Sequence, residues 1–519
     1  MVPDREFDNA ASNPHQALDE LLAYAVRSGL IDRSDLCWAR NRLLDVLDLT
    51  GDGQLAGPPK GARAAAAEGA AGAPGGPGVD KLLAPLLTDA AERGLIADTA
   101  GQRDLLDAAI MGAITARPSE VIDEFRRNYR TSPIVATDAF YQLCIANNYI
   151  HKERTDRNPR WSHPSRYGDL EITVNLAKPE KDPRDIAAAR NLPTIGYPGC
   201  LLCRENEGYR GRLDYPGRSN LRLVPLTLAE EAWYLQYSPY LYYPEHCIVL
   251  SETHVPMKLT SQTFARLLAF ATDFPHYFLG SNADLPIVGG SILGHDHFQG
   301  GRHRFPMDSA ATLARWSLAD GTVADVLDWP LATLRLTHSD PEILGRHGYA
   351  LLTAWRGHDE PETDVQHATG GVAHNTVTPV VRRSGQDYQL DIVLRNNRTT
   401  ARHPDGIFHP HAEIHPVKRE NIGLIEVMGL AVLPGRLATE LAILAQALAE
   451  DGPTPPEVAH HDRMLTACRG RPGEPWDVLR SAVGNYFATG LEHCGVFGIG
   501  AAALPRWRRL LTPLGWAQQ

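Results

Sequence analysis

The sequence predicts an α+β protein with a mainly antiparallel sheet, and three observations carry that prediction. Helical periodicity dominates residues 1–150 and returns after residue 435. Between these regions lie short β-rich runs such as "LEITVNL" and "YQLDIVLRN", which Pro and Gly separate. Few helical stretches interrupt the runs, and this disfavours the regular strand–helix alternation of a parallel sheet.

Residues 1–150 are predicted to form a helical module. In "NPHQALDELLAYAVRSGLI", Asn13 suits the N-cap, Pro14 suits the first turn and Gly29 suits the end of the helix. Residues 51–78 are rich in Ala, Gly and Pro and can bury little apolar surface. We therefore expect them to form a mobile insertion, after which helical patterns resume.

Two strand-rich regions follow, and a helical tail completes the chain. The first region, 165–335, contains one clear helix, "SQTFARLLAFATDF". The second runs from 336 to about 435, where helical sequences such as "RLATELAILAQALAE" begin. We predict domains at 165–335 and 336–519, because 519 residues exceed what one ordinary core holds.

Charge and composition narrow the class of partner. The formal net charge of −11 argues against a surface for nucleic acid or anionic membranes. The start has no basic segment followed by an apolar one, and no apolar run approaches the ~18 residues of a membrane span. The seven cysteines are an odd number, which does not suggest a disulfide framework. The sequence predicts a cytoplasmic protein with small-molecule substrates, and it leaves a homodimer open.

"CLLC" places Cys200 and Cys203 where one small ion can contact both sulfur atoms. A tetrahedral zinc site would need two further ligands, and no second Cys-x-x-Cys supplies them. Two buried cysteines in an apolar turn are the alternative. A thioredoxin-like redox pair is disfavoured, since no βαβ pattern surrounds the motif.

"HDHFQ" places His295, His297 and Gln299 at alternate positions. In an extended strand these three side chains share one face, while Asp296 and Phe298 point the other way. An inert exposed pair of histidines is one alternative. A cupin-like metal site is another, but it would want a Glu a few residues later, and "FQGGRHRF" contains none.

The longer stretch "NADLPIVGGSILGHDHFQGG" resembles the active-site segment of the galactose-1-phosphate uridylyltransferases, in the longer second class of that family. The family lies in the histidine-triad superfamily, whose signature is His-x-His-x-Gln. "GYPGCLLCRENEGY", "AHNTVTPV" and "FHPHAEIHPVKRENIGLIEVMGLAVLPGRL" are similar to this class as well. The resemblance implies two histidine-triad-like domains. It also implies ping-pong transfer of UMP from UDP-glucose to galactose 1-phosphate, through a uridylyl-histidine.

The resemblance assigns roles to particular residues. His297 takes the place of the nucleophile, and Gln299 that of a donor to the phosphoryl oxygens. The zinc ligands, in a mainly structural site, are Cys200, Cys203, His254 and His295. Asn282 and Asp284 occupy the stretch that reaches the nucleotide, and Lys178 and Lys181 are candidates for the substrate phosphates.

Three departures limit this transfer of roles. Ile292 stands where the shorter class of the family has Ser, and Asp296 stands where it has Pro. The second metal site of the shorter class uses a Glu, but no matching Glu lies near position 313, which is Leu313. Whether a second metal site forms is left open; the candidates for it are His374, His409, His411 and Glu413.

Two other functions remain as alternatives. One is a histidine-triad hydrolase or phosphorylase that acts on dinucleoside polyphosphates. The other is a zinc-binding protein without catalysis, which the nucleotide would never label.

Overall fold

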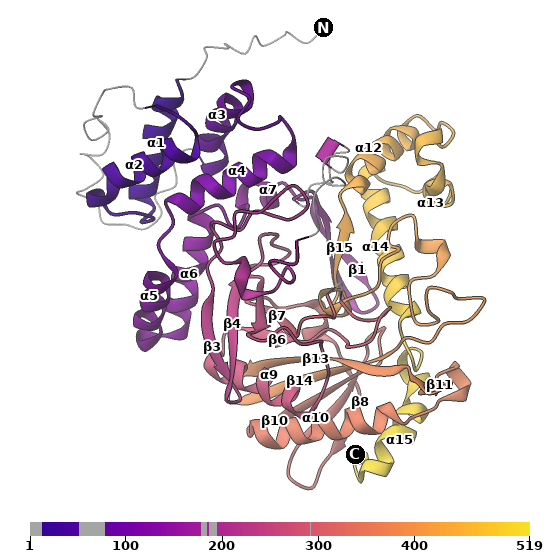
Figure 1. The fold of residues 1–519 in the computed structure, drawn as a ribbon. Coiled ribbons are helices and arrows are strands. Elements are labelled where there is room, and N and C mark those ends of the chain that lie inside the picture. The colour runs from indigo at the N-terminus through magenta and orange to yellow at the C-terminus, as the bar shows by residue number, and fades with distance from the viewer. Residues whose placement is uncertain (1–12, 51–77, 178–183, 186–194, 291, 519) are drawn as a thin grey trace. The chain divides into compact units, whose positions relative to one another are not determined.

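The computed structural model describes residues 13–50, 78–177, 184–185, 195–290 and 292–518 (Figure 1). The chain divides into two units. Unit one contains 1–156 and 179–224, and unit two contains 157–178 and 225–519. The predicted insertion, Gly78 excepted, lies outside the described residues, as do Lys178 and Lys181.

The first segment of unit one, which ends at Asp156, is helical in its described residues. Its first helix begins as the sequence indicates, since the Asn13 side chain accepts a hydrogen bond from the His15 N–H at 3.0 Å and Pro14 occupies the first turn. The helix ends at Arg27, and Gly29 follows with a φ of +73°, which a glycine adopts without strain. The α-helices of unit one are α1 (Pro14–Arg27), α2 (Leu36–Val46), α3 (Val79–Glu92), α4 (Ala100–Ala113), α5 (Pro118–Thr131), α6 (Pro133–Ala146) and α7 (Lys152–Asp156).

The core of unit one forms where the apolar faces of its first four helices meet. Leu21, Leu43, Leu86 and Ile110, one from each of these helices, are all fully buried in it. The helical spacing of apolar residues in the sequence therefore marks the faces that pack together.

Unit two is built on an eleven-stranded sheet with the order β16-β8-β9-β10-β14-β13-β6-β7-β5-β4-β3. The pairings from β16 to β4 are all antiparallel, which confirms the predicted α+β class. Its strands are β3 (Val224–Leu228), β4 (Glu231–Tyr237), β5 (Cys247–Ser251), β6 (Phe278–Gly280), β7 (His297–Gly301), β8 (Thr312–Ser317), β9 (Val323–Leu327), β10 (Thr333–His338), β13 (Asn375–Ser384), β14 (Asp387–Asn396) and β16 (Ala517–Gln518).

The two predicted strand-rich regions share this sheet. β6 belongs to 165–335 and β13 to 336–519, and they pair directly. A smaller sheet, β1 (Arg160–Ser165), β2 (Gly168–Asn175) and β15 (Leu430–Pro434), contains the parallel pair β2–β15. A hairpin joins β11 (Ala368–Thr369) to β12 (Val372–Ala373). The α-helices of unit two are α9 (Ser261–Asp273), α10 (Pro341–Arg356), α11 (Leu424–Val427), α12 (Arg436–Ala449), α13 (Asp462–Cys468), α14 (Pro475–His493) and α15 (Leu504–Leu511).

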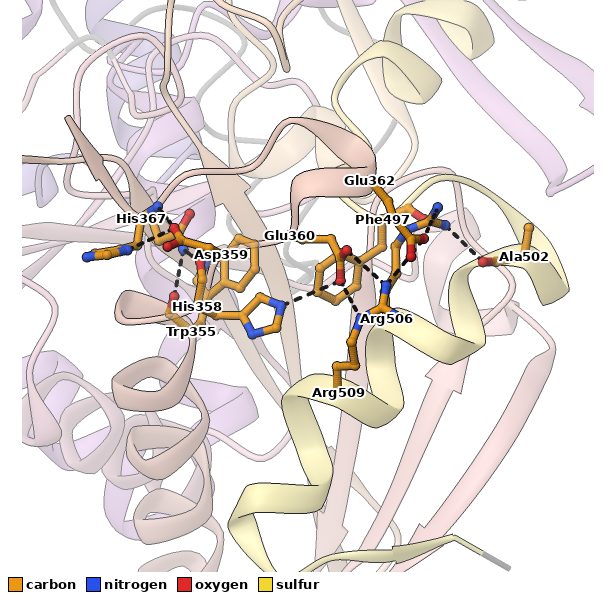
Figure 2. A network of polar contacts seen from close by, with 11 residues as sticks. Trp355, His358, Asp359, Glu360, Glu362, His367, Phe497, Ala502, Arg506 and Arg509 are labelled. Carbon is orange, nitrogen blue, oxygen red and sulfur yellow. Dashed lines mark hydrogen bonds and ion pairs between the residues drawn. The ribbon is translucent and has the colours of Figure 1, made fainter.

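A buried carboxylate holds α15 against the loop that follows α10. Glu360 is only 1% exposed, and its two oxygens accept hydrogen bonds from the Arg509 guanidinium at 2.8 and 2.9 Å (Figure 2). Arg506 on the same helix reaches Glu362 at 3.1 Å. Bidentate pairing of this kind offsets the cost of burying the carboxylate. Among the described helices, none combines the length and the apolar character needed to cross a membrane.

Candidate active site

β7 places the His-x-His-x-Gln motif inside the large sheet, between β5 and β6. The strand begins at His297, so His295 precedes it, whereas the sequence predicted one extended run. The predicted alternation is nevertheless present. Phe298 stacks on Trp233 with ring centroids 4.8 Å apart, and Asp296 accepts a hydrogen bond from Arg266 of α9 at 3.2 Å. His297 and Gln299 therefore project from the opposite face of the strand.

His297 is buried, with 6% of its surface exposed. Its Nδ1 lies 2.8 Å from the His295 carbonyl oxygen. A neutral ring that donates from Nδ1 to this carbonyl carries its lone pair on Nε2. Burial lowers the pKa of His297 to about 4, so the ring is neutral at neutral pH. The side chain is thus held in the tautomer that leaves the lone pair on Nε2.

His246 is a site residue that the sequence did not single out. It is buried beside Gln299, with its Nε2 at 3.3 Å from the Gln299 Oε1 and its Nδ1 at 3.3 Å from the Tyr240 carbonyl oxygen. Tyr243 packs on the ring with centroids 4.7 Å apart. Burial lowers the pKa of His246 to about 4 as well. The contact follows from register, because β5 pairs Ile248 with Gln299 and His246 lies just before that strand.

Two of the predicted zinc ligands, Cys200 and Cys203, lie in unit one. Their Sγ atoms are 3.6 Å apart, and the Cys203 N–H donates to the Cys200 carbonyl in the turn that joins them. Asn206 fixes this turn, since its Nδ2 donates to both cysteine carbonyl oxygens at 2.7 and 2.8 Å. Burial, and then the neighbouring Cys200, raise the pKa of the Cys203 thiol to about 11. A cation would reverse this preference for the thiol form.

The other two, His254 and His295, lie in unit two with ring centroids 4.9 Å apart. The His295 Nε2 is 2.9 Å from the Ser251 carbonyl oxygen. A proton on Nε2 leaves the lone pair on Nδ1, the arrangement that a metal-binding imidazole requires. Each unit therefore gathers one half of a set of two thiols and two imidazoles, and that set suits tetrahedral zinc.

Asn282 and Asp284 are held by bonds within the protein. The Asn282 Oδ1 accepts from the Leu424 N–H at 2.9 Å. Asp284 accepts from the Leu259 N–H at 2.9 Å, from Arg356 at 3.2 Å and from the Thr376 hydroxyl. The substrate contacts expected of these two residues stay predictions, as do those of Lys178 and Lys181.

A second cluster forms around the other histidine-rich segment, with different members from those expected. His411 and Glu413 meet His493 from the end of α14, and potential ligand atoms of the three lie within 4.8 Å of one another. His409 and His374 are not part of this group; His374 Nδ1 instead faces the Asn397 Oδ1 at 2.8 Å. The sequence missed His493 because only tertiary packing brings α14 to this segment.

Sequence similarity to known proteins extends over nearly the whole chain. Sequence models described as "Galactose-1-phosphate uridyl transferase, N-terminal domain" and "C-terminal domain" match residues 80–256 and 271–462. A galactose-1-phosphate uridylyltransferase of Halalkalibacterium halodurans is 46% identical, over 94% of this chain and 97% of the relative. One of Bacillus subtilis is 44% identical, over 96% and 97%. A crystal structure of yeast Ap4A phosphorylase Apa2 covers 63% of this chain and 96% of its own, at 12% identity and a TM-score of 0.29.

Proposed function

Since the chain belongs to the galactose-1-phosphate uridylyltransferase family, we propose that it moves the uridylyl group of UDP-glucose to galactose 1-phosphate by way of His297. The protein is a nucleotidyltransferase. The observation that carries the assignment to His297 is its buried, neutral ring, whose Nδ1 is bonded to the His295 carbonyl.

Transfer takes two displacements at the α-phosphorus. In the first, the lone pair on the His297 Nε2 forms a P–N bond and the P–O bond to glucose 1-phosphate breaks, so that the sugar phosphate leaves with that electron pair. In the second, a phosphate oxygen of galactose 1-phosphate attacks phosphorus and the P–N bond breaks, which returns the electron pair to Nε2. The ring is cationic only while it carries the uridylyl group. The His295 carbonyl stabilises this charge by accepting the Nδ1–H.

Gln299 supplies a donor on the same face, and His246 positions it. A neutral imidazole donates from one nitrogen only, and those of His246 face two oxygens at equal distance. With the proton on Nε2, His246 holds the Gln299 Oε1 and turns the amide –NH₂ away from itself, where it can donate to a phosphoryl oxygen. With the proton on Nδ1, the amide would present its oxygen instead and repel the phosphate. We assign the Nε2–H form.

We further propose that Cys200, Cys203, His254 and His295 bind one zinc ion. Two thiolates and two imidazoles form a donor set that tetrahedral zinc accepts. Within their own units, the two sulfur atoms already lie 3.6 Å apart and His295 is anchored through its Nε2. Bound zinc would supply the positive charge that keeps both sulfurs as thiolates. It would also fix His295, and with it the carbonyl that holds the His297 Nδ1–H.

The test of the nucleophile is covalent labelling with UDP-glucose that carries ³²P at the α-phosphate. The protein should retain label that is stable to base and released by acid, as expected of a phosphoramidate. His297→Gly should retain none, while His338→Gln, a histidine substitution on β10 of the same sheet, should label fully. Label on His297→Gly would show that another residue is the nucleophile.

Product analysis separates the alternatives. The transferase exchanges uridylyl groups between glucose 1-phosphate and galactose 1-phosphate. A hydrolase would transfer the nucleotidyl group to water and release UMP, and a phosphorylase would transfer it to phosphate and release a nucleoside diphosphate. A non-catalytic zinc protein would form neither product.

A further inference from the structure

Unit one contains a cluster of ionisable groups that uridylyl transfer does not use. Asp80 lies in the first turn of α3, Asp107 lies in α4, and His151 directly precedes α7. Potential ligand atoms of the three, one from each side chain, lie within 4.8 Å of one another. No sequence motif links these positions, which only the packing of the helices brings together.

Negative charge exceeds positive charge around this cluster. Asp107 is 2% exposed, and its carboxylate accepts hydrogen bonds from one amide nitrogen, the Asn148 Nδ2, at 3.0 and 3.2 Å. That nitrogen also donates to Asp80 at 3.2 Å. The guanidinium of Arg154 bonds Asp104 at 2.8 Å and stays 3.8 Å from Asp107. Three carboxylates therefore share the Arg154 guanidinium and one amide, while a second guanidinium, that of Arg218, acts on His151.

His151 adds an imidazole that is held in place but unsatisfied. Its carbonyl oxygen accepts the N–H groups of Arg154 and Thr155 at 3.0 and 2.9 Å, which fixes the residue at the start of α7. The Nδ1 is buried and has no hydrogen-bond partner among the residues that the structure describes. Burial and the neighbouring Arg154 lower the pKa of the ring to about 3, so it is neutral and carries a lone pair.

A divalent cation would balance the excess negative charge of the carboxylates and would give the unpartnered imidazole a ligand bond. Buried carboxylates are stable when paired or bound to a metal, and an unsatisfied buried nitrogen costs free energy. Two carboxylates with one imidazole form a mixed oxygen and nitrogen donor set, which first-row transition-metal ions accept better than Ca²⁺ or Mg²⁺ does. We propose that Asp80, Asp107 and His151 bind one divalent first-row transition-metal ion, which ties α3 and α4 to the start of α7.

Mn²⁺ is the probe, because it favours oxygen and nitrogen ligands and disfavours a thiolate-rich site such as Cys200 and Cys203. Full-length protein is stripped with chelator and titrated with Mn²⁺ at pH 7.5. The loss of the free-ion electron paramagnetic resonance signal counts the ions bound. Asp107→Asn and His151→Gln should each bind one equivalent fewer than the wild type, or bind that equivalent at least tenfold more weakly.

Two control variants complete the test. Asp104→Asn removes the partner of Arg154 but no ligand, and Cys203→Ser removes a thiol; both should bind as many Mn²⁺ ions as the wild type does. Circular dichroism verifies that each variant folds. If Asp107→Asn does not fold, His151→Gln alone tests the proposal, because the His151→Gln substitution removes no buried charge. Equal stoichiometry and affinity in the wild type and in folded His151→Gln, or a wild type that binds no Mn²⁺, would overturn the proposal.

Discussion

His297 in unit two and Asp107 in unit one are both almost completely buried ionisable groups, but their surroundings differ. His297 has a carbonyl at 2.8 Å to receive its one ring proton, and its pKa falls to about 4. Asp107 has one amide and a distant guanidinium, and burial raises its pKa to about 7. In both places burial favours the neutral form of the side chain.

The consequence of that preference is opposite in the two places. A neutral imidazole is the nucleophilic form, so burial suits His297 to the role that we propose for it. A carboxylate in the same situation must take up a proton or a cation. Glu360 shows the third outcome, in which both oxygens of a buried carboxylate accept hydrogen bonds from one guanidinium (Figure 2). What a buried group can do is therefore set by its nearest partner as much as by its burial.

The largest effect should come from removing the buried imidazole. His297→Gly should lower the turnover number on the order of 10⁶-fold, as loss of a nucleophile does, and shift the melting temperature little. A steady-state assay and a thermal melt of one preparation check both statements. If the variant melts far below the wild type, the ring is a packing residue first, and the contrast with Asp107 fails.

The next largest effect concerns Gln299. Gln299→Ala should lower the turnover number about 100-fold and leave the Michaelis constant nearly unchanged, because a preorganised donor acts on the charge that moves through phosphorus. Gln299→Glu should be slower still, since a carboxylate repels the phosphoryl oxygens. Single-turnover labelling measures this step. Unchanged labelling rates in both variants would remove Gln299 from the chemistry.

A smaller effect is expected at His246, which acts through Gln299. His246→Phe keeps an aromatic ring but removes the donor to the Gln299 Oε1, and it should lower the turnover number about 10-fold with little change in Michaelis constant. His246→Gln, whose amide can donate to the same oxygen, should restore part of the rate. A packing role predicts the reverse order, with Phe the better replacement.

The zinc proposal predicts a change in stability of a few degrees. Cys203→Ser should lower both the zinc content and the melting temperature, because metal that binds only the folded state stabilises it. Elemental analysis and calorimetry measure the two quantities. Full zinc occupancy in both Cys203→Ser and His254→Ala would exclude this ligand set.

The smallest effects, in the pH dependence of stability, test the comparison most directly. The folded-state pKa of His297 lies below its ordinary 6.5, so its contribution is complete above pH 6.5 and is lost as the pH falls towards 4. The folded-state pKa of Asp107 lies above its ordinary 3.8, so its contribution is complete below pH 3.8 and is lost as the pH rises through 7. As the pH rises from 5 to 8, the melting temperature should therefore fall less in Asp107→Asn than in the metal-free wild type. Parallel curves would contradict the assigned pKa of Asp107.

The sequence predicted what local chemistry determines. Asn13 and Pro14 mark the start of α1, and the alternation in "HDHFQ" places Phe298 and His297 on opposite faces of one strand. It did not predict that both strand-rich regions share one sheet, since strand pairing depends on partners far apart in the chain. His246 escaped notice for the same reason, because a lone histidine gains meaning only when β5 is set beside β7.

The network around Glu360 has a practical consequence for handling the protein. α15 leads through a short turn to β16, whose Ala517 and Gln518 pair with β8 along one margin of the large sheet. A truncation before Arg506 would remove both arginine partners and uncover the hydrogen-bonding groups of β8. Exposed strands of this kind recruit strands from other molecules, so such a fragment should aggregate on expression.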